Sequence, residues 1–204
     1  MSCKLIALEG IDGSGKSTMI KFIKSELERS GYEVVSVQTR EEEQEELFAE
    51  AVSKYAPDEN SPAYMFFFQV LHALKAEKAS KALGSGKIVV ADRWDLSFFV
   101  YHENFGFFSK ESESVRESVS RFAFQGLKPD LGIYLDVSVT RALERRVKRG
   151  ELISDVEAEI KFYTKVTDAY RGLAQRHGWI AVDANGDFNQ VKQLVWELVQ
   201  NITK

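Results

Sequence analysis

The chain is poor in the features that mark disulfide scaffolds, disordered arms and membrane proteins. Its single cysteine, Cys3, excludes an intrachain disulfide and a cysteine metal cluster. Three prolines and 13 glycines among 204 residues argue against long disordered arms. The longest apolar runs fall short of the roughly 18 residues that a spanning helix needs. Because the N-terminus also lacks a charged stretch followed by an apolar one, we expect no membrane association and a cytoplasmic location.

The charge balance and the length narrow the class further. A formal net charge of -4 argues against a general nucleic-acid binder, which would usually be basic. A hydrophobic content of 44% can supply a full core. At 204 residues the chain suits one α/β domain over residues 1–204 better than two domains.

Short apolar runs alternate with amphipathic runs along the whole chain. The expected buried strands cover residues 4–9, 33–38, 87–93, 129–137 and 179–184. Helical spacing follows from residue 17, with Gly31 placed to end that helix, and again over residues 41–55, about 63–83 and in the C-terminal half. Buried strands alternating with helices predict an α/β fold with a five-stranded parallel sheet and helices on both faces.

The stretch "LEGIDGSGKST" matches the phosphate-binding pattern G-x-x-x-x-G-K-[ST]. It follows an expected strand and opens an expected helix, which is the context that a P-loop requires. Lys16 would then supply positive charge to the β and γ phosphates, and the Ser17 hydroxyl could ligate Mg²⁺. The sequence therefore predicts a P-loop NTPase fold that binds ATP through Gly10, Asp12, Gly13, Ser14, Gly15, Lys16, Ser17 and Thr18.

Two strand ends carry residues suited to a second phosphate. Asp92 and Arg93 end one strand, and Arg40 ends another, at the edge where ligands bind in open parallel sheets. Asp92 could act on Mg²⁺, while the two arginines could bind an acceptor that already carries phosphate. A structural ion pair at a strand end remains the alternative for Asp92 and Arg93.

An arginine-rich stretch, "RALERRVKRGELIS", lies over residues 141–154. Leu143 and Val147 are expected to pack inward at i, i+4, while Arg145 and Arg149 share another face. One interpretation is a lid that closes arginines over the transferring phosphoryl group. The other is a solvated helix face.

Together these pieces resemble the thymidylate kinase family of nucleoside monophosphate kinases. The resemblance rests on "LEGIDGSGKST", "TRE", "DRWDLSFFVY", "LKPDLGIYLDV", "RGELISDVEAEIKFY" and "VDANGDFNQV", which span nearly the whole chain. It implies transfer of a phosphoryl group from ATP to dTMP with Mg²⁺, usually in a homodimer. It implies that Lys16, Asp92 and Arg93 serve catalysis and that Ser17 and Asp92 hold the metal.

The resemblance also assigns the acceptor site residue by residue. Asp12 would meet the 3′-hydroxyl, Tyr101 would crowd the 2′ position of the sugar, and Phe67 would stack on the base. The implied acceptor residues are Asp12, Arg40, Phe67, Leu71, Arg93, Ser97 and Tyr101. Because this P-loop has no arginine, the resemblance places the catalytic arginine in a lid over residues 145–156, among Arg145, Arg146 and Arg149.

Three departures from the family pattern bear on these assignments. Glu42 and Glu43 stand where the family continues with Pro-Gly-Gly, and Val156 follows Asp155 where the family often has arginine. Leu71 stands where the family has an arginine that reads the thymine carbonyl.

The third departure predicts loosened base selectivity. Gln69, His72 and Lys75 are candidates to compensate, and Lys75 is favoured because it lies one turn further on the same face.

Three readings of function remain open at this point. The first is a thymidylate-kinase-like enzyme, with dTMP or a broader set of monophosphates as acceptor. The second is a deoxynucleoside kinase with Glu41 as general base. The third is a nucleotide-binding relative without activity. The apolar helix "YMFFFQVLHAL" indicates either a homodimer interface or a fully buried helix.

Overall fold

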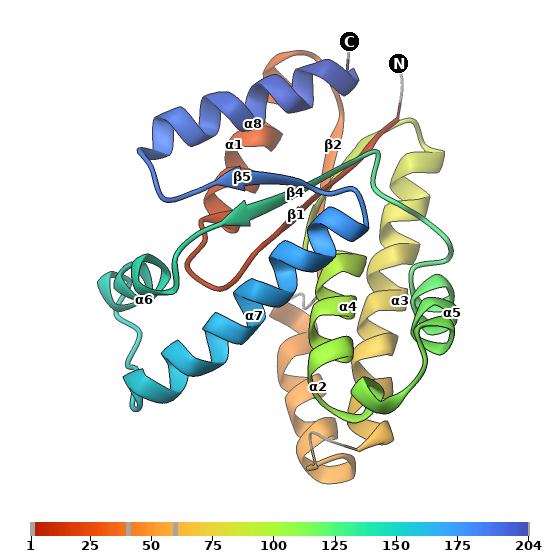
Figure 1. Ribbon diagram of the computed structural model, residues 1–204. Coiled ribbons are helices and arrows are strands. Elements are labelled where there is room, and N and C mark those ends of the chain that lie inside the picture. Colours follow the sequence, from red (N-terminus) through yellow and green to blue (C-terminus); the bar gives the residue numbers. More distant parts are fainter. Residues whose placement is uncertain (1–2, 40–41, 59–60, 204) are drawn as a thin grey trace.

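In the computed structural model, five parallel strands form one sheet, most of which can be followed in Figure 1. The strand order is β2-β3-β1-β4-β5. The structure describes residues 3–39, 42–58 and 61–203, with side chains in the second range described from residue 48 onward. The strands are β1 (Leu5–Glu9), β2 (Val34–Gln38), β3 (Ile88–Asp92), β4 (Leu131–Asp136) and β5 (Ile180–Asp183). Each lies within a predicted strand, so the predicted sheet is confirmed.

Helices cover both faces of the sheet (Figure 1). One face carries α1 (Lys16–Arg29) and α8 (Phe188–Thr203). The other carries α3 (Pro62–Gly84), α4 (Asp95–Asn104) and α7 (Val156–Arg176). The remaining helical elements are α2 (Glu42–Tyr55), the short 3₁₀ helix η1 (Phe107–Lys110), α5 (Glu113–Ala123) and α6 (Val139–Lys148).

The core sits between the sheet and its two helical layers. Every residue of β1 is buried, which is why this central strand reads as a continuous apolar run rather than an alternating one. Hydroxyl and carboxylate caps begin several helices, with Ser61 capping α3, Ser138 capping α6 and Asp155 capping α7. Gly31 lies just beyond α1 at φ +89°, as predicted for a helix end that needs the left-handed region.

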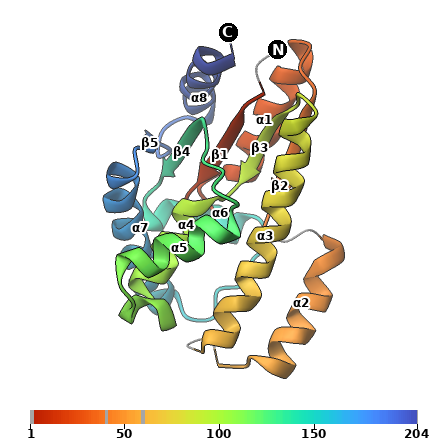
Figure 2. The ribbon, with the colours of Figure 1, turned by 90° about the vertical axis from the view of Figure 1, so that its right-hand side faces the viewer.

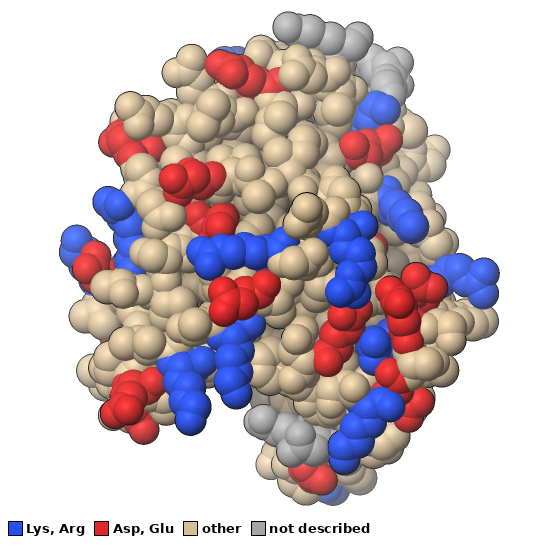
Figure 3. Space-filling view, viewed as in Figure 1, with Lys and Arg blue, Asp and Glu red and all other residues tan. Residues whose placement is uncertain are grey.

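The hairpin of α2 and α3 extends beyond the sheet, away from both chain ends (Figure 2). On the face seen in Figure 3, lysines and arginines lie interspersed with aspartates and glutamates, so the described part of that face has no large patch of one sign. Among the described helices, none is both long and apolar enough to cross a membrane.

Candidate active site

A cavity of about 1030 Å³ opens at the carboxyl ends of the strands. The loop after β1, the ends of β2 and β3, helices α3 and α4, and the segment between α6 and α7 all line it. This is the position where open parallel sheets bind ligands. The cavity therefore brings the P-loop together with the end of β3 and with the arginine-rich segment after α6.

The P-loop takes the backbone shape that phosphate binding needs. Gly15, at φ +101°, precedes α1 directly, and the first helical residue is Lys16. Gly13, at φ +88°, lies so close to α6 that an added Cβ would meet the Ala142 carbonyl oxygen at 2.3 Å. Of the predicted ATP-binding residues, Gly10 and Ser14 lie behind the cavity wall, and the others line it. A helix N-terminus facing this cavity suits an anion.

Lys16 is buried at the base of the loop. Its Nζ donates to the carbonyl oxygens of Gly10 at 2.9 Å and Ile11 at 3.1 Å, and lies 4.0 Å from Asp12 Oδ1. Burial, reinforced by the charge of Arg93, lowers the pKa of Lys16 to about 8. The ammonium is thus a poorly hydrated cation next to the loop, which favours its binding to phosphate oxygens.

Ser17 and Asp92, the two residues predicted to hold magnesium, line the same space. Both line the main cavity and a smaller adjoining pocket of about 240 Å³. Asp92 Oδ1 is buried and has no hydrogen-bond partner among the described residues, so a carboxylate oxygen is available to a cation or its water. One hydroxyl and one carboxylate fit Mg²⁺, which keeps several waters and shares phosphate oxygens.

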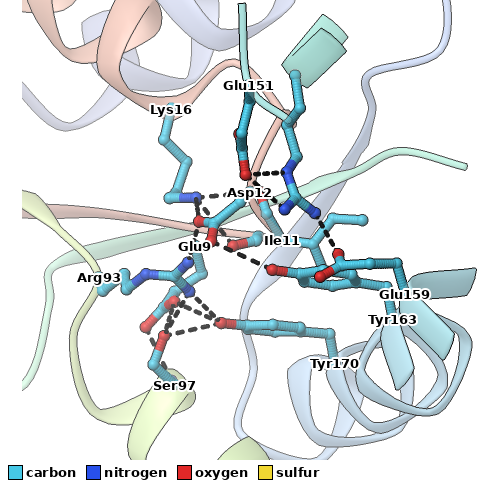
Figure 4. Close-up of polar contacts among 12 residues, drawn as sticks. Glu9, Ile11, Asp12, Lys16, Arg93, Ser97, Glu151, Glu159, Tyr163 and Tyr170 are labelled. Carbon is cyan, nitrogen blue, oxygen red and sulfur yellow. Dashed lines mark hydrogen bonds and ion pairs between the residues drawn. The ribbon is translucent and has the colours of Figure 1, made fainter. Parts of the chain in front are cut away.

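Asp12 and Arg93 meet across the mouth of the P-loop (Figure 4). Arg93 Nη2 donates to Asp12 Oδ1 at 2.7 Å, while Nη1 donates to Tyr170 Oη at 2.9 Å and Ser97 Oγ at 3.2 Å. Burial opposes charge on Asp12, yet Arg93 and Lys16 lower the pKa of this carboxyl below its ordinary value. Asp12 is therefore held as a carboxylate acceptor beside a fixed guanidinium.

Glu9 organises this corner of the site, and the sequence did not single it out. Its side chain is fully buried at the end of β1. One carboxylate oxygen accepts from the backbone N–H groups of Trp94 at 2.7 Å and Ser97 at 2.9 Å. The other accepts from Ser97 Oγ at 2.5 Å and Tyr170 Oη at 3.1 Å. Glu9 thus ties the P-loop strand to the β3–α4 junction that carries Arg93.

The three lid arginines take three different positions. Arg145 lies against the back of the P-loop, donating to the carbonyl oxygens of Gly13 and Ser14. Arg146 is buried and outside the cavity lining. Arg149 lines the cavity, and 62% of its side chain is exposed. Of the three, Arg149 is the one whose side chain is both exposed and part of the cavity lining.

The buried state of Arg146 reflects its partners on α7 and the preceding loop. Its guanidinium donates to Glu151 and Glu159, each at 2.6 Å, and lies 5.2 Å from the ring centre of Tyr163. Tyr163 in turn donates to Asp12 Oδ2 at 3.3 Å, which connects α7 with the P-loop.

Val147 is 55% exposed, so the prediction that it packs inward is wrong. Arg146 occupies the inner face because α7 offers it a carboxylate and a ring.

The acceptor end of the cavity departs from the predicted register by one residue. Ser97 and Tyr101 line the cavity as expected. Phe67 and Leu71 do not, and Phe68 and His72 take the corresponding places along α3. Leu71 is buried in the core instead. Two further residues from the sequence predictions, Arg40 and Glu41, lie outside the described residues.

Lys75, which was predicted to contact the base, instead contacts the chain segments that follow β2 and β3. Its Nζ donates to Thr39 Oγ1 at 2.8 Å and to the carbonyl oxygen of Arg93 at 2.9 Å, and it lies 5.3 Å from the ring centre of Trp94. Lys75 does not line the cavity. It joins the ends of β2 and β3 and so supports the segment that carries Arg93.

The fold and this cavity together define a P-loop nucleotide-binding protein of the kinase type, with an acceptor space beside the phosphate loop. Comparison with known proteins makes the class specific. The model of the thymidylate kinase family matches residues 8–195. The chain belongs to the thymidylate kinase family.

Individual relatives cover nearly the whole chain. A thymidylate kinase of Alteromonas mediterranea is 34% identical over 98% of this chain and 91% of its own length. One of Colwellia psychrerythraea is 30% identical over 96% of this chain and 93% of its own. One of Caldanaerobacter subterraneus is 28% identical over 100% of this chain and 98% of its own.

Proposed function

We propose that this protein transfers the γ-phosphoryl group of ATP to dTMP, giving ADP and dTDP. One observation carries the proposal: a single cavity joins Lys16 of the P-loop to Arg93 and to the aromatic side chains of α3 and α4. That space offers a site for a donor phosphate, an acceptor phosphate and a base. Membership of the family supports dTMP as the acceptor.

The mechanism follows from groups that are held in place before substrate binds. The P-loop amides and Lys16 would hold the β and γ phosphates of the donor. Arg93, fixed by Asp12, Ser97 and Tyr170, would bind the acceptor phosphate and hold its oxygen toward the γ phosphorus. Positioning and charge stabilisation of this kind provide most of the catalysis in phosphoryl transfer.

Ser17 and the unpartnered oxygen of Asp92 would hold Mg²⁺. Bound there, the ion would supply positive charge to neutralise the negative charge that develops on the phosphate oxygens.

We propose that residues 1–204 act as one kinase domain, with residues 145–156 as its lid. Arg149 and Glu151 line the cavity from this segment, which supports its role as a cover over the donor phosphates.

The test of the activity is ADP release from Mg-ATP with dTMP, dUMP, dCMP, dGMP, UMP and thymidine as acceptors. We expect turnover with dTMP and none with thymidine, because a neutral nucleoside gives Arg93 no anion to bind. Activity with thymidine alone would move the assignment to a nucleoside kinase. Silence across the panel would contradict the proposal.

Substitutions of Arg149 and Arg146 are expected to have different effects, the first on kcat and the second on stability. Arg149→Ala is expected to lower kcat about 10³-fold with little change in stability, since its side chain is exposed and reaches the cavity. Arg146→Ala is expected to lower the midpoint of thermal unfolding, because it removes the hydrogen bonds that the buried guanidinium donates to Glu151 and Glu159. Steady-state kinetics and thermal unfolding of both variants separate the two roles. Equal kcat values for wild type and Arg149→Ala would remove Arg149 from catalysis.

We also propose that the protein is a homodimer that packs through α3. Phe66, Val70 and Leu74 follow one another at i, i+4, i+8 on this helix and are 57%, 57% and 44% exposed. An apolar stripe of this kind on the outside of a helix favours a second helix as its partner.

Phe66→Glu together with Val70→Glu is therefore expected to shift the molar mass in solution from dimer to monomer. Light scattering after size-exclusion chromatography measures it. A Glu pair at the exposed positions Lys21 and Ser25 of α1 is the matched control and should leave the mass unchanged. A monomeric wild type would refute the dimer.

A further inference from the structure

The cavity has two chemically different ends. Lys16, Asp92 and Arg93 surround the phosphate end. The opposite end is walled by the rings of Tyr64, Phe68, Phe98 and Phe105. Aromatic walls suit a flat nucleobase, but stacking on them is tolerant of base identity. Discrimination between bases must therefore come from polar side chains at this end.

Two histidines, His72 and His102, line the aromatic end. His72 is only 6% exposed, and its Nδ1 is buried without a hydrogen-bond partner among the described residues. Burial, together with the nearby charge of Lys75, lowers the pKa of His72 well below its ordinary value. Burial also lowers the pKa of His102 to about 4. Both rings are therefore neutral at pH 7, so each has one donor and one acceptor nitrogen.

The protein fixes the proton on one ring and leaves the other open. Gln69 Nε2 lies 3.2 Å from His102 Nε2 and 3.4 Å from the Met65 carbonyl oxygen. An amide nitrogen only donates, so His102 Nε2 accepts and its proton sits on Nδ1. Within the described part of the chain, no hydrogen bond to His72 Nδ1 fixes the tautomer of that ring.

We propose that His72 reads the edge of the acceptor base and that its free choice of tautomer admits both thymine and cytosine nucleotides. The substrate class would be pyrimidine deoxynucleoside monophosphates with either an oxygen or an amino group at C4. This inference rests on the proposed function and specifies its acceptor.

The chemistry of the two base edges explains the dual acceptance. Thymine presents the O4 acceptor, and cytosine presents the N4 amino donor. A neutral imidazole donates to the first in one tautomer and accepts from the second in the other. A guanidinium has donors only, so an arginine at this place would favour thymine and oppose cytosine.

The first experiment measures kcat/KM of the full chain for dTMP and dCMP with Mg-ATP. We expect the two values to lie within about tenfold of each other, since a neutral imidazole can pair with either substituent at C4. His72→Arg is expected to raise the dTMP preference about 100-fold, and His72→Gln, which keeps a donor and an acceptor, should retain both activities. His177→Gln is the matched control: that ring stacks on Phe99 outside the cavity, and the ratio should not move.

A second readout keeps the inference testable if His72→Arg does not fold. ¹⁵N NMR of the His72 ring should show opposite nitrogens protonated with dTMP and with dCMP. Turnover of dTMP with dCMP poorer by about 1000-fold, or one tautomer with both nucleotides, would overturn this inference alone. Failure to phosphorylate any monophosphate would overturn the proposed function and this inference with it.

Discussion

Replacing Lys16 by alanine is expected to lower kcat for dTMP phosphorylation by at least about 10²–10³-fold. Lys16 is buried beneath the phosphate loop, and no other lysine lines the cavity among the described residues. Its charge acts where water is largely excluded, so the loss cannot be made up by solvent. Steady-state ADP release at saturating ATP and dTMP measures the effect.

The matched control is Lys24→Ala on the same helix, whose ammonium lies 3.8 Å from Glu28 on the surface. It should leave kcat unchanged and alter stability by no more than about 1 kcal/mol. Turnover that is undiminished in Lys16→Ala would contradict phosphoryl transfer at this loop.

Replacing Glu9 by alanine is expected to lower the free energy of unfolding by roughly 3–5 kcal/mol. The change leaves two buried backbone N–H groups, those of Trp94 and Ser97, without an acceptor. It also frees Tyr170 and Ser97, which hold Arg93, so kcat/KM should fall as well. Urea unfolding followed by tryptophan fluorescence measures the first effect, because Trp94 lies at this junction.

Glu9→Gln separates the two contributions. Its amide oxygen can still accept from both backbone N–H groups, while the hydroxyls of Ser97 and Tyr170 can rotate to accept from the amide nitrogen. We expect most of the stability to be retained. A Glu9→Ala protein as stable as wild type would show that the buried carboxylate does not organise this junction.

The sheet was predictable from the sequence because its strands are buried on both faces. A segment such as "KIVVADR" reads as one apolar run, and its polar end marks the edge where ligands bind. Lys16 and Ser17 were predictable for a related reason: one local motif combines the strand end, the loop and the helix start.

Contacts between residues far apart in the sequence could not be predicted from local sequence patterns. Glu9 meets Tyr170 across 161 residues, and Asp12 meets Tyr163 across 151. Tyr163 ends the stretch "RGELISDVEAEIKFY" on which the resemblance rests, but no local pattern assigns it a contact with Asp12, and nothing around Tyr170 marks it as a site residue. Glu9 itself gave one signal, a carboxylate inside an apolar strand, which requires buried donors around it.

The one-residue difference between the residues of α3 that were predicted to face the acceptor and those that line the cavity has a physical cause. Phe66, Phe67 and Phe68 follow one another, and the helix is apolar on every side in its first half. In a helix with a single apolar stripe, the sequence shows which face is buried. In a helix that is apolar on every side, the sequence does not show which residues face a cavity. The resemblance therefore assigned Phe67 and Leu71 to the acceptor base by their position in the sequence, whereas Phe68 and His72 line the cavity in the folded chain.

Arg93 is held in a backbone conformation that its own residue type disfavours. It sits at φ +63°, a left-handed conformation that costs a side chain with a Cβ about 1–2 kcal/mol and costs glycine nothing. Glycine at this position would relieve that strain, but it would also remove the hydrogen bonds that the guanidinium donates to Asp12, Ser97 and Tyr170. Those hydrogen bonds hold the strained residue in place, so the direction of the guanidinium is set by the fold before any ligand arrives.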